Sequence, residues 1–258
     1  MNVKDLFDLK GRTALVTGGS RGLGLQMAEA LGEMGARVAI TARKQSELDE
    51  AVARLAAAGI DARAWVCDLG RRDAIAPVAD AVLAHYGRVD ILVNNAGATW
   101  GAPAEDHPLE AWDKLVNLNL SGAFVLTQIV AKRSMIPAKW GRILNVSSVN
   151  GLFANDPRLV RTAAYVATKH GLVGLTKQLA AEWGAHGITV NAICPGFFPS
   201  KMTRATLDTT GAFVKEATPT HRLGNDEDLK GLTVLLASEA SRHITGQAIV
   251  VDGGASVV

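Results

Sequence analysis

The sequence predicts an α/β fold, a single Rossmann-type domain whose doubly wound parallel sheet carries helices on both faces. Short strand-like runs alternate with amphipathic segments of helical length from residue 13 to residue 251. The strand-like runs are continuously apolar, which is typical of strands covered on both faces in a parallel sheet. No linker, low-complexity segment or break in composition interrupts the 258 residues, so we expect one domain over residues 1–258.

The elements follow a repeated order of helix, glycine and strand. A glycine just past a helix takes the left-handed conformation without a Cβ penalty. We expect this role for Gly35, Gly59, Gly87, Gly141 and Gly187. The expected strands contain residues 14–16, 37–40, 60–66, 90–93, 142–146, 188–193 and 248–251. Amphipathic helices are expected over 46–57, 71–86, 112–134 and 163–184.

Composition excludes several classes of protein. Hydrophobic residues make up 48% and charged residues 20%, enough for a sizeable core, and the net charge of +2 is dispersed. We therefore expect no nucleic-acid partner. Cys67 and Cys194 are expected to be buried free thiols, and the six histidines show no metal-ligand spacing, so no metal site is expected. The N-terminus lacks an apolar signal region and no apolar run approaches about 18 residues, which predicts a cytoplasmic protein with no membrane partner.

A glycine-rich turn follows the first expected strand. The run TGGSRGLG (Thr17–Gly24) leads into the helix-like LQMAEALGEM. Such a turn lets the backbone approach a pyrophosphate and points a helix N-terminus at its negative charge. The glycines have the spacing G-x-x-x-G-x-G, and the alternative is a turn that only links strand to helix. The expected dinucleotide contacts here are Gly18, Ser20, Arg21, Gly22, Leu23 and Gly24.

The end of the second expected strand indicates which dinucleotide binds. An acidic residue there would bond the ribose hydroxyls and favour NAD. The sequence instead has Thr41-Ala42-Arg43-Lys44, and Arg43 offers bidentate geometry for a 2′-phosphate, with Arg21 as a second cation. The sequence therefore predicts a preference for NADP(H). If these arginines are ordinary surface charges, NAD(H) remains possible.

Tyr165 and Lys169 are spaced to share one face of a helix, a turn apart. A free phenol has a pKa of about 10, and a nearby cation lowers that value. A phenol made more acidic in this way is suited to general acid–base catalysis near neutral pH. The alternative is a packed tyrosine beside a lysine whose ammonium reaches solvent.

Five motifs occur in a specific order: TGGSRGLG, NNAG (Asn94–Gly97), NVSS (Asn145–Ser148), YVATK (Tyr165–Lys169) and CPG (Cys194–Gly196). Together they resemble the short-chain dehydrogenase/reductase family over nearly the whole chain. The segments NAICPGFFPSKMT and LFDLKGRTALVTGG look most like bacterial 3-oxoacyl-reductase-like and gluconate 5-dehydrogenase-like members. The resemblance implies an oxidoreductase that reduces a ketone or oxidises a secondary alcohol, with a small-molecule substrate and a homotetrameric assembly.

The resemblance also implies roles for individual residues. Tyr165 matches the catalytic acid/base and Lys169 the residue that lowers its pKa and binds the nicotinamide ribose. Ser148, in preference to Ser147, matches the hydroxyl that holds the substrate carbonyl. Asn119, in preference to its neighbour Asn117, matches the residue that holds a water next to the lysine. The remaining expected cofactor contacts are Asp68, Leu69, Asn95, Ala96, Gly97, Pro195, Gly196, Phe198 and Ser200.

Two segments are expected to shape the substrate pocket. Residues 149–164 separate Ser148 from Tyr165 by sixteen residues, where family members commonly have about a dozen. Arg158 and Arg161 on this loop are candidates for binding a substrate carboxylate or phosphate, or are solvated loop charges. Residues 197–222 are expected to form a lid. Candidate pocket walls are Trp100, Phe197, Phe198 and Met202.

Three alternative functions remain. One is an NAD-preferring sugar-acid or polyol dehydrogenase of the same family. Another is a nucleotide-binding regulator without catalysis, which the presence of Asn119, Ser148, Tyr165 and Lys169 disfavours. The third, an epimerase or dehydratase of the family's extended branch, is disfavoured by the glycine spacing and by the short chain after Pro195.

Overall fold

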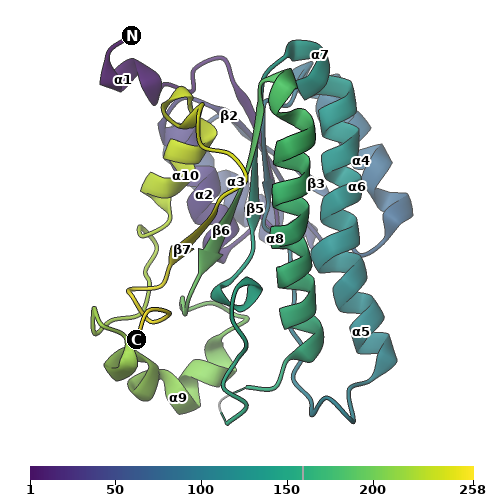
Figure 1. Ribbon diagram of the computed structural model, residues 1–258. Helices are drawn as coiled ribbons and strands as arrows, with labels where there is room; N and C mark the ends of the chain where they lie inside the picture. The colour runs from purple at the N-terminus through teal and green to yellow at the C-terminus, as the bar shows by residue number, and fades with distance from the viewer. Residues whose placement is uncertain (159) are drawn as a thin grey trace.

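Seven parallel strands form one sheet between two layers of helices in the computed structural model, which describes residues 1–158 and 160–258 (Figure 1). The order across the sheet is β3-β2-β1-β4-β5-β6-β7. This arrangement confirms the predicted Rossmann-type fold. The strands are β1 (Thr13–Thr17), β2 (Arg37–Ala42), β3 (Ala62–Val66), β4 (Ile91–Asn94), β5 (Gly141–Val146), β6 (Ile188–Pro195) and β7 (Ala248–Val251).

The α-helices are α1 (Val3–Leu6), α2 (Gly22–Glu33), α3 (Gln45–Ala57), α4 (Arg72–Tyr86), α5 (Leu109–Val116), α6 (Gly122–Val130), α7 (Ile136–Ala138), α8 (Ala163–Trp183), α9 (Arg204–Ala217) and α10 (Lys230–Ala237). Shorter turns are η1 (Asn117–Ser121), η2 (Ala131–Met135), η3 (Val149–Gly151), η4 (Gly184–His186) and η5 (Glu239–Ser241). Each of the four helices expected from amphipathicity is present within a few residues of its expected bounds.

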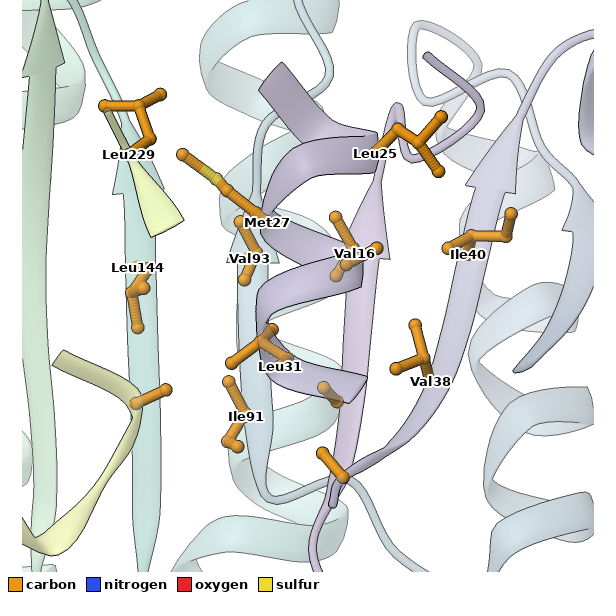
Figure 2. Close-up of a cluster of buried hydrophobic side chains, with 14 of the residues drawn as sticks. Val16, Leu25, Met27, Leu31, Val38, Ile40, Ile91, Val93, Leu144 and Leu229 are labelled. Carbon is orange, nitrogen blue, oxygen red and sulfur yellow. The ribbon is translucent and has the colours of Figure 1, made fainter. Parts of the chain in front are cut away.

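The two larger hydrophobic clusters lie on opposite faces of the sheet, because successive strand side chains point to opposite sides. On one face Val16 and Ile40 pack with α2, α3 and α10. Figure 2 shows Met27 and Leu31 of α2 in the same cluster, beside Val93 and Ile91 of β4. On the other face Leu15 packs with residues of α4, α6 and α8. Coverage on both faces explains the continuous apolar runs.

The glycines after helices fall into two groups. Gly35, Gly59, Gly87 and Gly187 have positive φ angles between 72° and 94°, as expected. The expectation for Gly141 is wrong, because the left-handed residue at that helix end is Lys139, with φ of 49°. Gly141 instead begins β5, where a Cβ atom would lie 2.7 Å from the Met135 sulfur. A close approach, rather than a turn, requires this glycine.

One helical segment is longer than the sequence indicated. Helix α5, η1, α6, η2 and α7 continue into one another over Leu109–Ala138, whereas we expected residues 112–134. By length and composition alone this segment is long and apolar enough to cross a membrane. It contains no uninterrupted apolar run of about 18 residues, so the sequence pattern did not indicate it. In the fold, α6 packs on α4 and α5 packs on α8, so the segment belongs to the helical layer that covers one face of the sheet.

The strand order reverses direction between β1 and β4. In open α/β sheets, ligands bind outside the carboxyl ends of the strands at such a switch point. Helix α9 and the C-terminus lie at the same end of the sheet (Figure 1). The glycine-rich turn after β1 and the residues after β4 therefore meet where a ligand site is expected.

Candidate active site

The turn after β1 has the backbone geometry that a phosphate requires. Gly18 and Gly22 have positive φ angles of 63° and 53°, and an added Cβ at Gly22 would meet no atom within 4 Å. At Gly24 a Cβ would collide with the Gly18 carbonyl and the Asn95 side chain. Helix α2 begins at Gly22, earlier than the sequence indicated, so its first turn faces the loop. The open backbone and the helix N-terminus together fit a dinucleotide pyrophosphate.

Asn95, which directly follows the neighbouring strand β4, holds this turn in place through hydrogen bonds. Its side-chain Nδ2 donates to the carbonyl oxygens of Thr17 and Gly18 at 2.9 and 3.1 Å. In the other direction, the Thr17 hydroxyl accepts from the backbone N–H groups of Asn95 and Ala96 at 2.9 and 3.0 Å. The side chain of Asn95 therefore holds the glycine-rich turn. Two residues further along the chain, Gly97 lies beside Asn119 and Lys169.

The residues expected at the adenosine end lie on the other side of the turn. Arg21 and Arg43 are both exposed, and the Arg21 guanidinium pairs with Glu47 at 2.7 Å. The Asp68 carboxylate accepts from the Gly70 N–H at 3.0 Å, and Leu69 is buried beside it. Two cations and no strand-end carboxylate fit a dinucleotide that carries a 2′-phosphate. Glu47 had not been singled out from the sequence.

Tyr165 and Lys169 lie on one face of α8, and the lysine is buried. The Lys169 Nζ donates to the Val146 carbonyl at 2.7 Å and lies 5.6 Å from the centroid of the Tyr165 ring. Burial raises the pKa of Tyr165, and the neighbouring Ser148 hydroxyl lowers it by a smaller amount. Lys169 is not among the causes of this shift, so the expected lowering of the phenol pKa by the lysine stays a prediction. Burial lowers the pKa of Lys169 itself to about 8.

The two serines after β5 have different surroundings. The Ser147 hydroxyl donates to the Lys169 carbonyl oxygen at 3.0 Å and is committed to the packing of α8. Ser148 is the N-cap residue of η3, where its hydroxyl accepts from the Asn150 N–H at 3.1 Å, and it lines the same cavity as Tyr165. This difference agrees with the preference for Ser148 over Ser147.

Asn119 lies in the π-helical turn η1, next to Lys169. Its Nδ2 donates to the Ala98 carbonyl at 2.9 Å and to the Thr168 hydroxyl at 3.1 Å, and its Oδ1 accepts from the Ala98 N–H at 2.9 Å. Asn117 points elsewhere and accepts from Arg72 at 3.4 Å. A π-helical turn often marks a functional position. Here it directs Asn119 into the protein, where its remaining acceptor capacity faces Gly97.

A cavity of about 490 Å³ adjoins Ser148 and Tyr165. Phe197 and Met202 line it as expected, whereas Phe198 is buried in the core and Trp100 lies exposed outside it. Several of its polar walls were not found from the sequence, because no motif marks them and they come from distant loops. These additional lining residues include Thr99, Asn150, Asn155, Thr162, Thr203 and Thr206.

Arg158 and Arg161, the two arginines of the loop 149–164, have different surroundings. The Arg158 side chain is 87% exposed and forms a bidentate pair with Asp156, in which Nη2 donates to Oδ2 at 2.6 Å and Nε donates to Oδ1 at 3.0 Å. Arg161 lines the cavity, and its Nε donates to the Pro157 carbonyl at 3.3 Å. Only Arg161 is therefore positioned to meet a bound molecule. Leu159, between them, lies outside the described residues.

The segment after β6 closes the other side of the site. Gly196 lines the cavity, and a Cβ there would lie 2.6 Å from Asp252 Cβ. The Phe198 side chain packs under Gly224, so only its backbone is available to a cofactor. Ser200 exchanges hydrogen bonds with Thr203 before α9, and Pro195 ends β6. Phe197 and, from α9, Thr206 border the cavity, and the expected role of residues 197–222 as a lid stays a prediction.

Both cysteines are buried free thiols, as expected. Within residues 1–158 and 160–258, no three His, Cys, Asp or Glu side chains gather as metal ligands.

Residues 12–211 match the short chain dehydrogenase family. The chain is 39% identical to gluconate 5-dehydrogenase of Gluconobacter oxydans, covering 100% of this chain and 99% of that protein. It is 37% identical to a 3-oxoacyl-[acyl-carrier-protein] reductase of Staphylococcus epidermidis, over 94% of this chain and 98% of the other. The crystal structure of a gluconate 5-dehydrogenase from Burkholderia cenocepacia in complex with NADP and tartrate superposes with a TM-score of 0.93, at 35% identity and with 100% of both chains covered.

Proposed function

Because the chain belongs to the short chain dehydrogenase family of oxidoreductases, we propose that it interconverts a secondary alcohol and a ketone with NADP(H). One observation carries the proposal. Tyr165 and Ser148 line a single cavity, and the buried Lys169 lies next to Tyr165. This arrangement supports a proton donor and a carbonyl-binding hydroxyl acting at one substrate atom.

In the direction of ketone reduction, the Tyr165 hydroxyl transfers its proton to the substrate oxygen, and the C–O double bond becomes a single bond. The hydride for the carbonyl carbon would come from bound NADPH, which would be oxidised to NADP⁺. Alcohol oxidation runs the same exchange backward, with Tyr165 oxygen accepting the hydroxyl proton. Ser148 donates a hydrogen bond to the substrate oxygen and stabilises the negative charge that develops there.

Lys169 and Asn119 are proposed to act next to this proton transfer. A lysine pKa of about 8 lets the ammonium and the neutral amine both be populated near neutral pH, which suits a group that returns a proton to the tyrosine. Its Nζ lies near Gly97 and Asn119, since a Cβ placed on Gly97 would be 3.6 Å from Nζ and 3.3 Å from Asn119 Oδ1. Asn119 would hold a water that connects the lysine to solvent.

Preference for NADP(H) over NAD(H) is supported by charge. Arg21 and Arg43 flank the end of β2, where a carboxylate would otherwise favour the unphosphorylated ribose. The alternative, an NAD-preferring sugar-acid or polyol dehydrogenase, is tested by comparing kcat/KM for the two cofactors.

The substrate proposed for this cavity is a small hydroxylated acid. The cavity has apolar walls, among them Val149, Phe197 and Met202, and it also presents threonine and asparagine side chains and the cation of Arg161. The polar groups suit the hydroxyl groups of such an acid, whose carboxylate Arg161 would bind. The gluconate 5-dehydrogenase relative acts on a molecule of this kind, judging by its name. We propose that the protein works in the cytoplasm as a homotetramer, and native mass measurement tests the assembly.

The experiment that tests the proposed chemistry compares Tyr165→Phe with Tyr86→Phe. Tyr86, the other tyrosine, donates to the Val38 carbonyl at 3.3 Å and packs in the core. Loss of the Tyr165 hydroxyl is expected to lower kcat by about a hundredfold or more, with NADPH affinity nearly unchanged. Tyr86→Phe should retain kcat. NADPH binding without turnover of any ketone or alcohol in a broad panel would favour the regulator instead.

A further inference from the structure

Glu47 is the carboxylate that lies among the cations of the expected adenosine site. Its Oε1 accepts from Arg21 Nη1 at 2.7 Å and lies 3.6 Å from the Lys44 ammonium. Arg21 belongs to the glycine-rich turn, and Lys44 directly precedes α3. Glu47 therefore connects the phosphate loop to the segment that follows β2.

This connection lies beside the end of β2, where the ribose of a dinucleotide is expected. The turn is attached to β2 because the Gly19 N–H donates to the Thr41 carbonyl at 3.2 Å. A Cβ at Gly19 would lie 2.7 Å from the Ile40 side chain, so the two segments are in close contact. In this fold the residues just after the second strand contact the ribose hydroxyls. A 2′-phosphate there would meet the group that Glu47 already holds.

We propose that Glu47 is a specificity-determining residue that competes with the 2′-phosphate of NADP(H) for the Arg21 guanidinium. A phosphate bound through Arg21 either displaces Glu47 from the guanidinium or shares the guanidinium with it, and in both cases the Glu47 carboxylate opposes the nearby anion. A dinucleotide without this phosphate leaves the pair intact. Glu47 therefore narrows the difference in affinity between NADP(H) and NAD(H). This inference rests on the proposed function, because it requires a dinucleotide at this site.

The solvent exposure of Arg21 and Glu47 limits how strongly Glu47 changes the affinity for NADP(H). The Arg21 side chain is 48% exposed and the Glu47 side chain 24%, so solvent screens their attraction. Arg43 is exposed and forms no ion pair within residues 1–158 and 160–258, and it keeps its donors available to a phosphate. Removal of the Glu47 charge is thus expected to change the NADP⁺ to NAD⁺ affinity ratio about three- to tenfold.

The test measures binding rather than turnover. The full chain, Glu47→Gln and the matched control Glu50→Gln are titrated with NADP⁺, NAD⁺, 2′,5′-ADP and 5′-AMP by calorimetry at low salt. Glu50 lies on the same helix and is exposed, so its removal changes the net charge equally. We expect Glu47→Gln to tighten NADP⁺ and 2′,5′-ADP about three- to tenfold, and to change NAD⁺ and 5′-AMP by less than about twofold. Glu50→Gln should change none of them by more than about twofold.

The same Glu47→Gln substitution made in an Arg21→Gln variant shows whether Glu47 acts through Arg21. In Arg21→Gln, which lacks the contested guanidinium, Glu47→Gln should tighten NADP⁺ by a smaller factor than in the unmodified chain. An unchanged or weaker NADP⁺ affinity in Glu47→Gln, or an equal gain in Glu50→Gln, overturns the inference while the proposed function stands. If the unmodified chain binds neither dinucleotide, the proposed function fails, and this inference fails with it.

Discussion

The Lys169 ammonium lies 5.6 Å from the centre of the Tyr165 ring, and its hydrogen-bond partner is the Val146 carbonyl at 2.7 Å. The pair thus shares a helix face, but burial dominates the titration of both groups. It raises the pKa of the phenol and lowers that of the lysine to about 8. Burial is therefore the main cause of the pKa shift in each of the two groups.

The buried lysine predicts how stability depends on pH. Its folded pKa of about 8 lies below the unfolded value, so between pH 8 and 10 the unfolded chain binds more protons and stability rises with pH. From pH 7.5 to 9.5 the unfolding free energy of the unmodified chain should rise relative to that of Lys169→Met by about 2 kcal/mol. Urea unfolding at several pH values measures this difference.

Tyr165 does not interfere in this range, because its raised pKa costs stability only above about pH 10. Lys177→Met is the control, since Lys177 is exposed on the same helix. A difference between the unmodified chain and Lys169→Met that stays constant with pH would show that Lys169 is not titrating as a buried group.

Substitution of the two serines after β5 is expected to affect different properties, catalysis for Ser148 and stability for Ser147. Ser148→Ala should lower kcat about a hundredfold by removing the hydrogen bond to the developing oxyanion. Ser147→Ala loses its bond to the Lys169 carbonyl and should reduce the unfolding free energy by about 1 kcal/mol, with kcat falling much less. Steady-state kinetics and urea unfolding on both variants separate the two effects. Equal losses of kcat would remove the distinction between the two serines.

Gly24→Ala should abolish dinucleotide binding. The added methyl group would collide with the Gly18 carbonyl and the Asn95 side chain, which together shape the phosphate turn. Gly231→Ala in α10 is the control, because an added Cβ there meets nothing within 4 Å. Titration with NADPH should show no saturable binding for Gly24→Ala and unchanged affinity for Gly231→Ala. Normal affinity in Gly24→Ala would mean that the turn does not contact the cofactor.

Arg161 and Arg158 distinguish the class of substrate. If Arg161 binds a carboxylate, Arg161→Ala should lower kcat/KM for a six-carbon hydroxy acid about tenfold or more, through a lost charge-assisted hydrogen bond. For the neutral polyol of the same length the change should be within about twofold. Arg158→Ala, which removes an exposed arginine already paired with Asp156, should leave both values unchanged. Equal effects of Arg161→Ala on both substrates would exclude a carboxylate contact.

Much of this molecule could be predicted from the sequence because local patterns determine it. Apolar runs covered on both faces gave the sheet, and left-handed glycines such as Gly35 marked the helix ends. The motifs at Thr17–Gly24, Asn95 and Tyr165 also sit where a strand or helix places them at one end of the sheet. Their convergence follows from strand order, which the parallel fold constrains strongly.

The rest depends on contacts between distant segments. The pKa shift of Lys169 comes from the depth of its burial, which spacing along a helix does not reveal. Gly141 is required by a side chain, Met135, that reaches it only in the folded protein. The separation of Arg161 from Arg158 and the contact of Glu47 with Arg21 arise from loop and side-chain geometry that no sequence motif records.

Because of the π-helical turn at Asn117–Ser121, the position of Asn119 depends on the number of residues between α5 and α6. One residue deleted from this turn would restore regular α-helical winding and rotate the preceding residues by about 100° relative to those that follow. Asn119 would then leave its contacts with Ala98 and Thr168, although every side chain of the site remained in the sequence. Transplanting this segment between homologous proteins would succeed only if residue number, as well as residue type, is preserved.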